Sequence, residues 1–180
     1  MLMNLRYQRL TTCRLQCWTS GQFDAAAYQT MEPSGDVPAL MPRVARLSDD
    51  MLSFKSEIQD LAILDTNGKP IPAHDHDRRF FEAAWMHKYK DTYYFSYSTG
   101  DTHFLAYATG DNPLGPFTYR GKILDPVLGW TTHHSIVEFQ GKWYLFYHDA
   151  SLSKGVNHLR SVKVKEIFYN EKGDIKLSPS

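Results

Sequence analysis

The sequence contains little cysteine, no surplus of charge and no long apolar run, and each of these absences excludes a class of protein. Its two cysteines, Cys13 and Cys17, cannot form a disulfide framework, and without neighbouring ligands they give little support to a zinc site. The 20 basic residues balance the 20 acidic residues, so no positive surplus exists to neutralise phosphates, and nucleic acid is not expected as a partner. No run of 18 apolar residues occurs, so neither a membrane span nor a membrane partner is expected.

The N-terminal segment differs in composition from the rest of the chain. Its first 23 residues contain no acidic residue and carry Arg6, Arg9 and Arg14, but they lack the continuous apolar core of a secretory signal. We expect residues 1–40 to form an atypical segment that is either non-native or poorly ordered. With neither a secretory signal nor a membrane span visible, the compartment is unknown and the cytoplasm is the default expectation.

Aromatic residues are plentiful, at 14% of the chain, and they lie in two stretches that repeat each other fifty residues apart. The first stretch runs from Glu82 to Tyr97 and the second from Thr132 to Tyr147. Each has a short run, a polar two-residue turn and an aromatic-rich run, whereas helical patterns are nearly absent. A repeat of this length made of strand-forming residues is typical of the blades of a β-propeller.

Turn residues divide each repeat unit into four predicted strands, which is the number in a propeller blade. The predicted strands are residues 83–89, 92–98, 103–109 and 117–123 in the first unit, and 133–139, 142–148, 158–164 and 165–169 in the second. Residues 43–47 predict a strand of a preceding, partial blade. We therefore expect residues 41–180 to form an incomplete, all-β propeller of about two and a half four-stranded blades. Exposed blade faces are expected to promote self-association.

Glu82 is the residue most suited to acid catalysis. It follows Phe80 and Phe81 and precedes Trp85 by three positions, and a carboxyl group among apolar neighbours loses hydration, which favours its protonated form. Such an acid can protonate the leaving oxygen of a glycoside near neutral pH. The alternative is a glutamate at the surface or at a strand edge, in an ion pair with Arg78 or Arg79.

Four segments together resemble glycoside hydrolase family 43, which contains β-xylosidases, α-L-arabinofuranosidases and arabinanases on a five-bladed propeller. The resemblance covers roughly residues 40–176, and the segments occur in the family's order. They are Phe80-Phe-Glu-Ala-Ala-Trp-Met-His-Lys-Tyr, Tyr93-Tyr-Phe-Ser-Tyr-Ser-Thr-Gly-Asp, Asn112-Pro-Leu-Gly-Pro-Phe and His133-His-Ser-Ile-Val-Glu-Phe-Gln-Gly-Lys-Trp-Tyr-Leu-Phe-Tyr-His148.

The resemblance implies an inverting glycosidase with Glu82 as its general acid. In this mechanism a second carboxylate activates water across the sugar, and in the family a third carboxylate tunes the acid. Both of these aspartates lie upstream in relatives, and nothing in residues 1–40 resembles either motif; Asp24 and Asp36 stand in a different context. The chain thus carries the acid without a recognisable base.

The resemblance also assigns roles to other residues. His133 corresponds to a histidine of the central channel that lies near calcium or another ion in relatives, or is hydrogen-bonded there without a metal. Arg160 corresponds to an arginine that reaches the sugar and the acid, and its alternative is a surface charge. Trp85 and His134 are candidate contacts for the sugar, with packing between blades as the alternative for both. No organic cofactor is implied. The run from His74 to Asp77 has the composition of a metal cluster, but runs of this kind are usually solvated.

Two functions follow for the chain. One is part of an inverting glycosidase that hydrolyses xylose- or arabinose-containing oligosaccharides or polysaccharides. The other is a non-catalytic remnant or carbohydrate-binding propeller, favoured by the missing base aspartate. In both cases the expected partner is a small carbohydrate.

Overall fold

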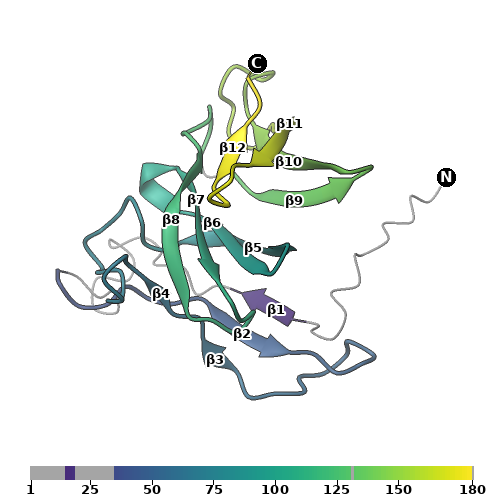
Figure 1. The fold of residues 1–180 in the computed structure, drawn as a ribbon. Helices are drawn as coiled ribbons and strands as arrows, with labels where there is room; N and C mark the ends of the chain where they lie inside the picture. The colour runs from purple at the N-terminus through teal and green to yellow at the C-terminus, as the bar shows by residue number, and fades with distance from the viewer. Residues whose placement is uncertain (1–14, 19–34, 131, 180) are drawn as a thin grey trace.

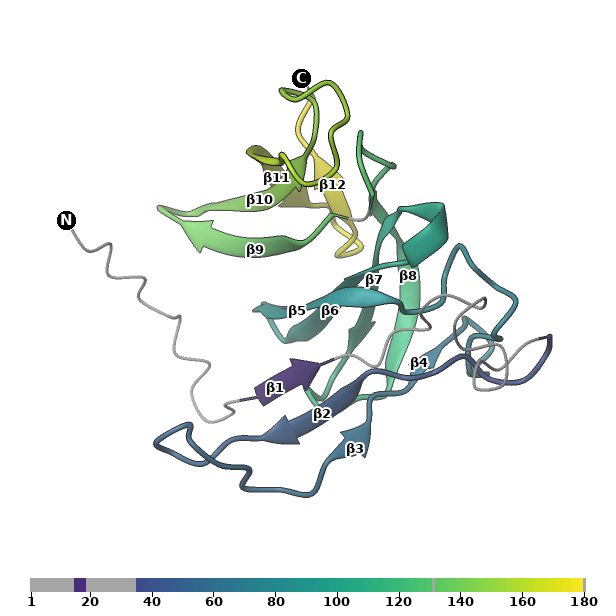
Figure 2. The same ribbon diagram turned by 180° about the vertical axis from the view of Figure 1, so that it is seen from behind.

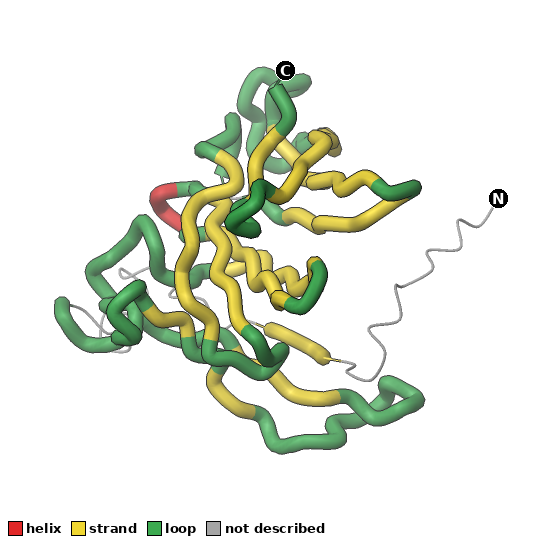
Figure 3. The backbone as a smooth tube through the Cα atoms, viewed as in Figure 1, coloured by secondary structure: helices red, strands yellow, loops and turns green. Residues whose placement is uncertain are grey.

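The computed structural model describes residues 15–18, 35–130 and 132–179, and these consist almost entirely of strands and loops (Figure 3). The single helical element among them is the short 3-10 turn η1 (Gly100–Thr102). The strands are β1 (Leu15–Trp18), β2 (Arg43–Arg46), β3 (Gln59–Asp60), β4 (Ile63–Leu64), β5 (Glu82–Tyr89), β6 (Thr92–Ser98), β7 (Leu105–Gly110), β8 (Phe117–Leu124), β9 (His134–Phe139), β10 (Lys142–Asp149), β11 (Ser161–Tyr169) and β12 (Ile175–Leu177).

Three sheets follow one another in the order of the chain (Figure 1). The first has the strand order β1-β2-β3, the second β4-β8-β7-β6-β5 and the third β12-β11-β10-β9. Strand β5 contacts β1 of the first sheet and β9 of the third, so the innermost strands of the three sheets are neighbours, as the reverse view also shows (Figure 2). Sheets that radiate from neighbouring inner strands are the arrangement of propeller blades.

The middle sheet is buried on both faces because its strands alternate apolar side chains between two cores. On β6, Phe95 and Tyr97 pack toward the first sheet, whereas Tyr94 packs toward the third. Neighbouring β7 repeats the pattern, with Ala106 in the first core and Tyr107 in the second. Successive side chains of a strand point to opposite faces. The aromatic run of β6, which is continuous in sequence, therefore contributes to two separate cores.

Most predicted strands are confirmed, but the last part of the second unit was assigned incorrectly. Residues 158–164 and 165–169 are not two strands; β11 is one strand from Ser161 to Tyr169, and its residues 161–167 pair with β10. The fourth strand of this sheet is β12, which follows the predicted turn at residues 170–173. That turn is closed by the Gly173 amide, which donates to the Asn170 carbonyl at 2.9 Å.

Besides β12, the short strands β1, β3 and β4 were not predicted from the sequence. β1 lies within the atypical N-terminal segment and pairs antiparallel with β2, so four residues of that segment extend the first sheet. β4 pairs parallel with β8 and adds a fifth strand to the middle sheet. β3 pairs antiparallel with β2. All three strands are too short for a hydrophobic period to reveal them. No helix in the described part of the chain is long and apolar enough to cross a membrane.

Candidate active site

A β-bulge places Glu82 at the start of β5. Glu82 pairs with Ser98 and Trp85 pairs with Ser96, so one extra residue lies on β5 between these two pairs. Ala83 takes up the irregularity with a positive φ of 60°. A bulge redirects side chains and is common beside active sites. Phe81 is buried immediately before Glu82, and a Cβ added to Gly100 would lie 2.7 Å from the Phe81 ring, so the backbone approaches this ring closely.

Glu82 and His133 meet because β5 and β9 are neighbouring inner strands that begin at the same side of the molecule. The Glu82 Oε1 atom lies 3.7 Å from His133 Nε2, and the Glu82 side chain is 29% exposed. The hydrogen bond and charge of Glu82 raise the pKa of His133 above its ordinary value, although partial burial opposes this. The carboxyl group is thus partly shielded from solvent and lies within ion-pairing distance of the His133 ring.

Arg160 reaches this group of residues through His148. The Arg160 Nη1 atom lies 3.2 Å from His148 Nε2, and the His133 backbone amide donates to the same nitrogen at 3.0 Å. On its other side, Arg160 Nε donates to the Asn157 carbonyl at 2.8 Å. Partial burial, together with the nearby Arg160 and His133, lowers the pKa of His148. The structure therefore brings Glu82, His133 and Arg160 together in one network.

Trp85 and His134 lie in the seam between the middle and third sheets. The Trp85 indole donates to the Ile136 carbonyl at 3.1 Å, and His134 Nε2 lies 2.6 Å from the Ser96 hydroxyl. Burial lowers the pKa of His134 to about 3, so its ring is neutral. Both residues therefore pack between blades, as the alternative to a sugar contact predicts. A role of Trp85 and His134 as sugar contacts stays a prediction.

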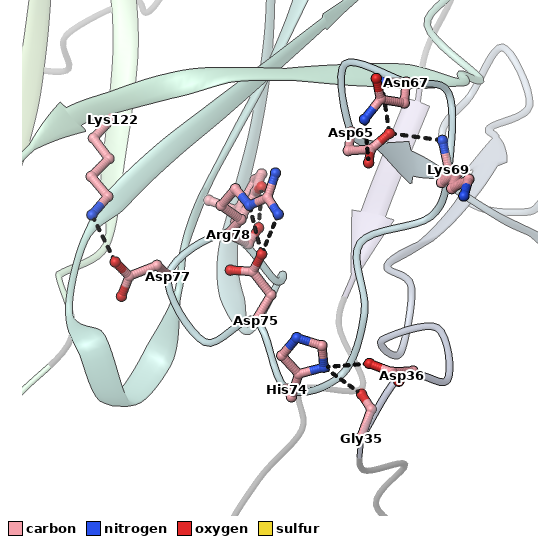
Figure 4. A network of polar contacts seen from close by, with 11 residues as sticks. Gly35, Asp36, Asp65, Asn67, Lys69, His74, Asp75, Asp77, Arg78 and Lys122 are labelled. Carbon is pink, nitrogen blue, oxygen red and sulfur yellow. Dashed lines mark hydrogen bonds and ion pairs between the residues drawn. The ribbon is translucent and has the colours of Figure 1, made fainter.

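The loop from His74 to Asp77 uses its polar side chains to fix the backbone, as Figure 4 shows for three of them. His74 Nδ1 lies 2.8 Å from the Gly35 carbonyl and 3.3 Å from Asp36, whereas Asp75 accepts from Arg78 and Asp77 pairs with Lys122 at 3.2 Å. His76 pairs with Asp101. Because its side chains bind different partners, they fix the loop through separate hydrogen bonds and ion pairs and do not form a metal cluster.

The described residues do not provide a ligand set for calcium. They include no group of three or more histidine, cysteine, aspartate or glutamate side chains placed to hold a metal ion. Calcium prefers six to eight oxygen ligands, and His133 offers one imidazole that already lies beside Glu82. Asp36, whose side chain is fully exposed, pairs with His74 in the loop just described, and Asp24 lies outside the described residues.

Sequence reasoning did not identify His148 and Asn157 as parts of the site. His148 closes the fourth of the segments that carry the resemblance, directly after the aromatic run. The signal that would have found it is strand register: β10 runs antiparallel to β9, and the pair Tyr147–His134 places His148 opposite His133. Asn157 lies in a loop, where no periodicity predicts which side chain faces the site.

Comparisons with known proteins agree with this geometry. The model of the family described as glycosyl hydrolases family 43 matches residues 40–175. The xylosidase/arabinosidase 43A of Humicola insolens is 64% identical over 166 residues, which are 90% of this chain and 51% of that protein. The chain thus spans about half the length of the curated relatives it matches.

Two solved structures show the same arrangement of sheets. The GH43_1 enzyme from Xanthomonas citri, in complex with xylotriose, is 48% identical and superposes with a TM-score of 0.83 over 91% of this chain and 52% of its own. CoXyl43, a β-xylosidase/α-arabinofuranosidase from a compost metagenome, is 67% identical, with a TM-score of 0.76 over 78% of this chain and 42% of its own. It is described with xylotriose, in a calcium-free form.

The predicted fold class is confirmed, because the matching structures are five-bladed propellers. The order of the inner strands, the bulge that presents Glu82 and the match of residues 40–175 lead to one conclusion: this chain belongs to glycosyl hydrolases family 43.

Proposed function

We propose that this chain supplies the acid side of an inverting glycosidase site that acts on xylose- or arabinose-containing oligosaccharides. The observation that carries the proposal is the 3.7 Å approach of Glu82 to His133 at the start of two neighbouring inner strands, with Arg160 joined to them through His148. The relatives named as xylosidases and arabinosidases, and the structures described with xylotriose, support this class of substrate.

In the proposed reaction, Glu82 donates a proton to the glycosidic oxygen as the bond to the anomeric carbon breaks. A guanidinium can donate two hydrogen bonds to vicinal hydroxyls, so Arg160 would orient the sugar. Water attacks from the opposite face in an inverting enzyme, and a carboxylate must take its proton. That carboxylate has no recognisable counterpart in residues 1–40, so the proposal assigns no base within this chain.

Calcium has no step in this mechanism. Calcium, the ion named for a structural relative, could bind the imidazole of His133, but the described residues provide no further set of protein ligands. We therefore propose that any calcium beside His133 would be held mainly by water.

The function is tested by turnover of aryl β-xyloside and aryl α-arabinofuranoside by the wild type, Glu82→Gln and Glu171→Gln. Glutamine keeps the size of Glu82 but cannot donate a carboxylic proton, so we expect Glu82→Gln to lower kcat at least about 100-fold. The exposed Glu171, in the turn before β12, is the matched control and should leave kcat unchanged. Equal turnover by the wild type and Glu82→Gln would refute the assignment.

The stereochemistry of the product tests inversion. Proton NMR during the first turnovers should show α-xylose released from a β-xyloside, because water attacks opposite the leaving group. Release of β-xylose would contradict an inverting mechanism.

A carbohydrate-binding function without turnover is the second candidate, and the missing base aspartate favours it. Calorimetric titration with xylotriose separates the two. Binding that Arg160→Met weakens, with no measurable turnover of either aryl glycoside, would establish a binding module.

A further inference from the structure

Two groups of the candidate site converge on one nitrogen atom. His148 Nε2 receives the His133 backbone amide at 3.0 Å and lies 3.2 Å from Arg160 Nη1. These two residues come from different segments: His133 immediately precedes β9, and Arg160 immediately precedes β11. His148 is on β10, which lies between β9 and β11 in the sheet and pairs with both. The ring is therefore placed to fix the two segments relative to each other.

The donors define the chemical state of this ring. A backbone amide and a guanidinium can donate hydrogen bonds but cannot accept them. The His148 Nε2 atom must therefore offer a lone pair, which requires the neutral ring with its proton on Nδ1. A lysine, an arginine or a protonated histidine at this position would place a hydrogen-bond donor opposite the His133 amide and the Arg160 guanidinium, which are both donors.

The ring is itself held in place. The His148 backbone amide donates to the Thr132 hydroxyl at 3.1 Å, and this hydroxyl donates to the His148 carbonyl at 2.7 Å. Thr132 is 2% exposed, so water does not compete freely for these bonds. The His148 ring also stacks on that of His133, with 6.0 Å between the ring centroids and 20° between the planes. Backbone bonds and ring stacking together keep Nε2 pointing at its two donors.

We propose that His148 is a positioning residue, whose Nε2 lone pair sets the placement of both His133 and Arg160 around Glu82. The inference rests on the proposed function for its consequence, because His133 faces the acid at 3.7 Å and Arg160 is the proposed sugar clamp. Loss of this acceptor would leave the Arg160 guanidinium with its bonds to Asn157 and would release the His133 amide, so both sugar binding and proton delivery would suffer. A misplacement of about 1 Å costs an enzyme as much as 100-fold in rate.

The test compares His148→Gln with His148→Leu. The glutamine side-chain oxygen can accept near the position of Nε2, whereas leucine has similar bulk and no acceptor. We expect His148→Leu to lose at least tenfold in kcat/KM on the aryl glycosides and in xylotriose affinity. His148→Gln should keep both within about threefold of the wild type. His74→Leu, which removes a histidine from the loop of residues 74–77, is the control. Its kcat/KM and xylotriose affinity should match those of the wild type.

A readout that needs no sugar separates this proposal from the proposed function. Amide hydrogen exchange at His133, followed by NMR, should be at least tenfold faster in His148→Leu than in the wild type, and close to the wild type in His148→Gln. If the wild type neither turns over nor binds xylotriose, the proposed function fails, and the exchange rates still decide the role of His148.

Three results would overturn the role of His148. The first is a leucine variant with unchanged sugar affinity, kcat/KM and His133 exchange. The second is a folded glutamine variant as impaired as the leucine variant. The third applies if the leucine variant does not fold, so that the glutamine variant must decide. It is a tenfold loss of kcat/KM or xylotriose affinity in a glutamine variant whose melting temperature is normal.

Discussion

Ala83 is the residue whose backbone conformation presents the proposed acid. Its φ of 60° lies in the left-handed region, which costs a residue other than glycine about 1–2 kcal/mol. The cost is borne at the bulge between Glu82 and Trp85, where the strand must accommodate one extra residue. Strain at such a position is a feature of functional sites that the surrounding structure imposes.

Substitution of Ala83 tests this account at the residue scale. A β-branched side chain tolerates a positive φ worse than alanine, so Ala83→Val should lower the free energy of unfolding by about 1–2 kcal/mol. Ala83→Gly removes the steric strain but adds freedom to the unfolded chain, so it should lie within about 1 kcal/mol of the wild type. Urea denaturation measures both, and a valine variant as stable as the wild type would contradict the assigned strain.

Strand β5 joins the middle and third sheets through His87. This side chain is 6% exposed, stacks on Tyr94 and lies 2.6 Å from the Tyr169 hydroxyl. Burial lowers its pKa from 6.5 to about 3. Between these two pH values the unfolded chain binds a proton that the folded chain excludes. The contribution of His87 to stability is therefore complete above about pH 6.5 and declines as the pH falls toward 3.

His87→Leu tests this linkage at the scale of the element. One excluded proton costs about 1.4 kcal/mol per pH unit, so between pH 7 and pH 5 the wild type should lose about 2 kcal/mol through His87. The leucine variant should lose about that much less over the same interval, whatever its stability at pH 7. Leu52→Ala, at an 87% exposed position without a titratable group, is the control and should retain the wild-type slope. Parallel curves of stability against pH for the wild type and His87→Leu would rule the effect out.

At the scale of the whole molecule, the third sheet leaves one face open to solvent. Its inner face carries Leu145 and Ile167 against the middle sheet, whereas the opposite face exposes several apolar side chains beside the ion pair of Lys142 with Glu166. The exposed members of this face, which we call the outer face, are Phe146, Val162, Val164 and Phe168. Phe146 and Val164 are direct cross-strand neighbours, so the apolar surface is continuous across β10 and β11. Contiguous apolar surface of this kind favours association.

Self-association through the outer face stays a prediction. We expect sedimentation velocity to show an average mass that rises with protein concentration, and Val164→Lys to suppress the rise by placing a charge in the centre of the face. Leu52→Lys, at an 87% exposed position in the turn between residues 48 and 53, should not change it. A single monomeric species at every concentration would show that the face does not mediate association.

The amino-acid pattern was enough to predict most strands, the blade-like units and the placement of Glu82 and His133 at the start of inner strands. It could do so because alternation, turn residues and the fifty-residue repeat are local properties of the chain. It misjudged residues 158–169, where the exposed Val162 and Val164 gave no clear strand boundary. It also did not find β1, β3, β4 or β12, which are strands of two to four residues.

Which side chains meet depends on how the sheets pack and could not be predicted from the local sequence. The bulge at Ala83 shifts the register of β5, and the pairing of β10 with both β9 and β11 brings His148 between His133 and Arg160. The same packing places Trp85 and His134 in the seam between sheets. Strand alternation assigns a residue to one of two faces, but the partner on that face comes from a segment that the local sequence does not specify.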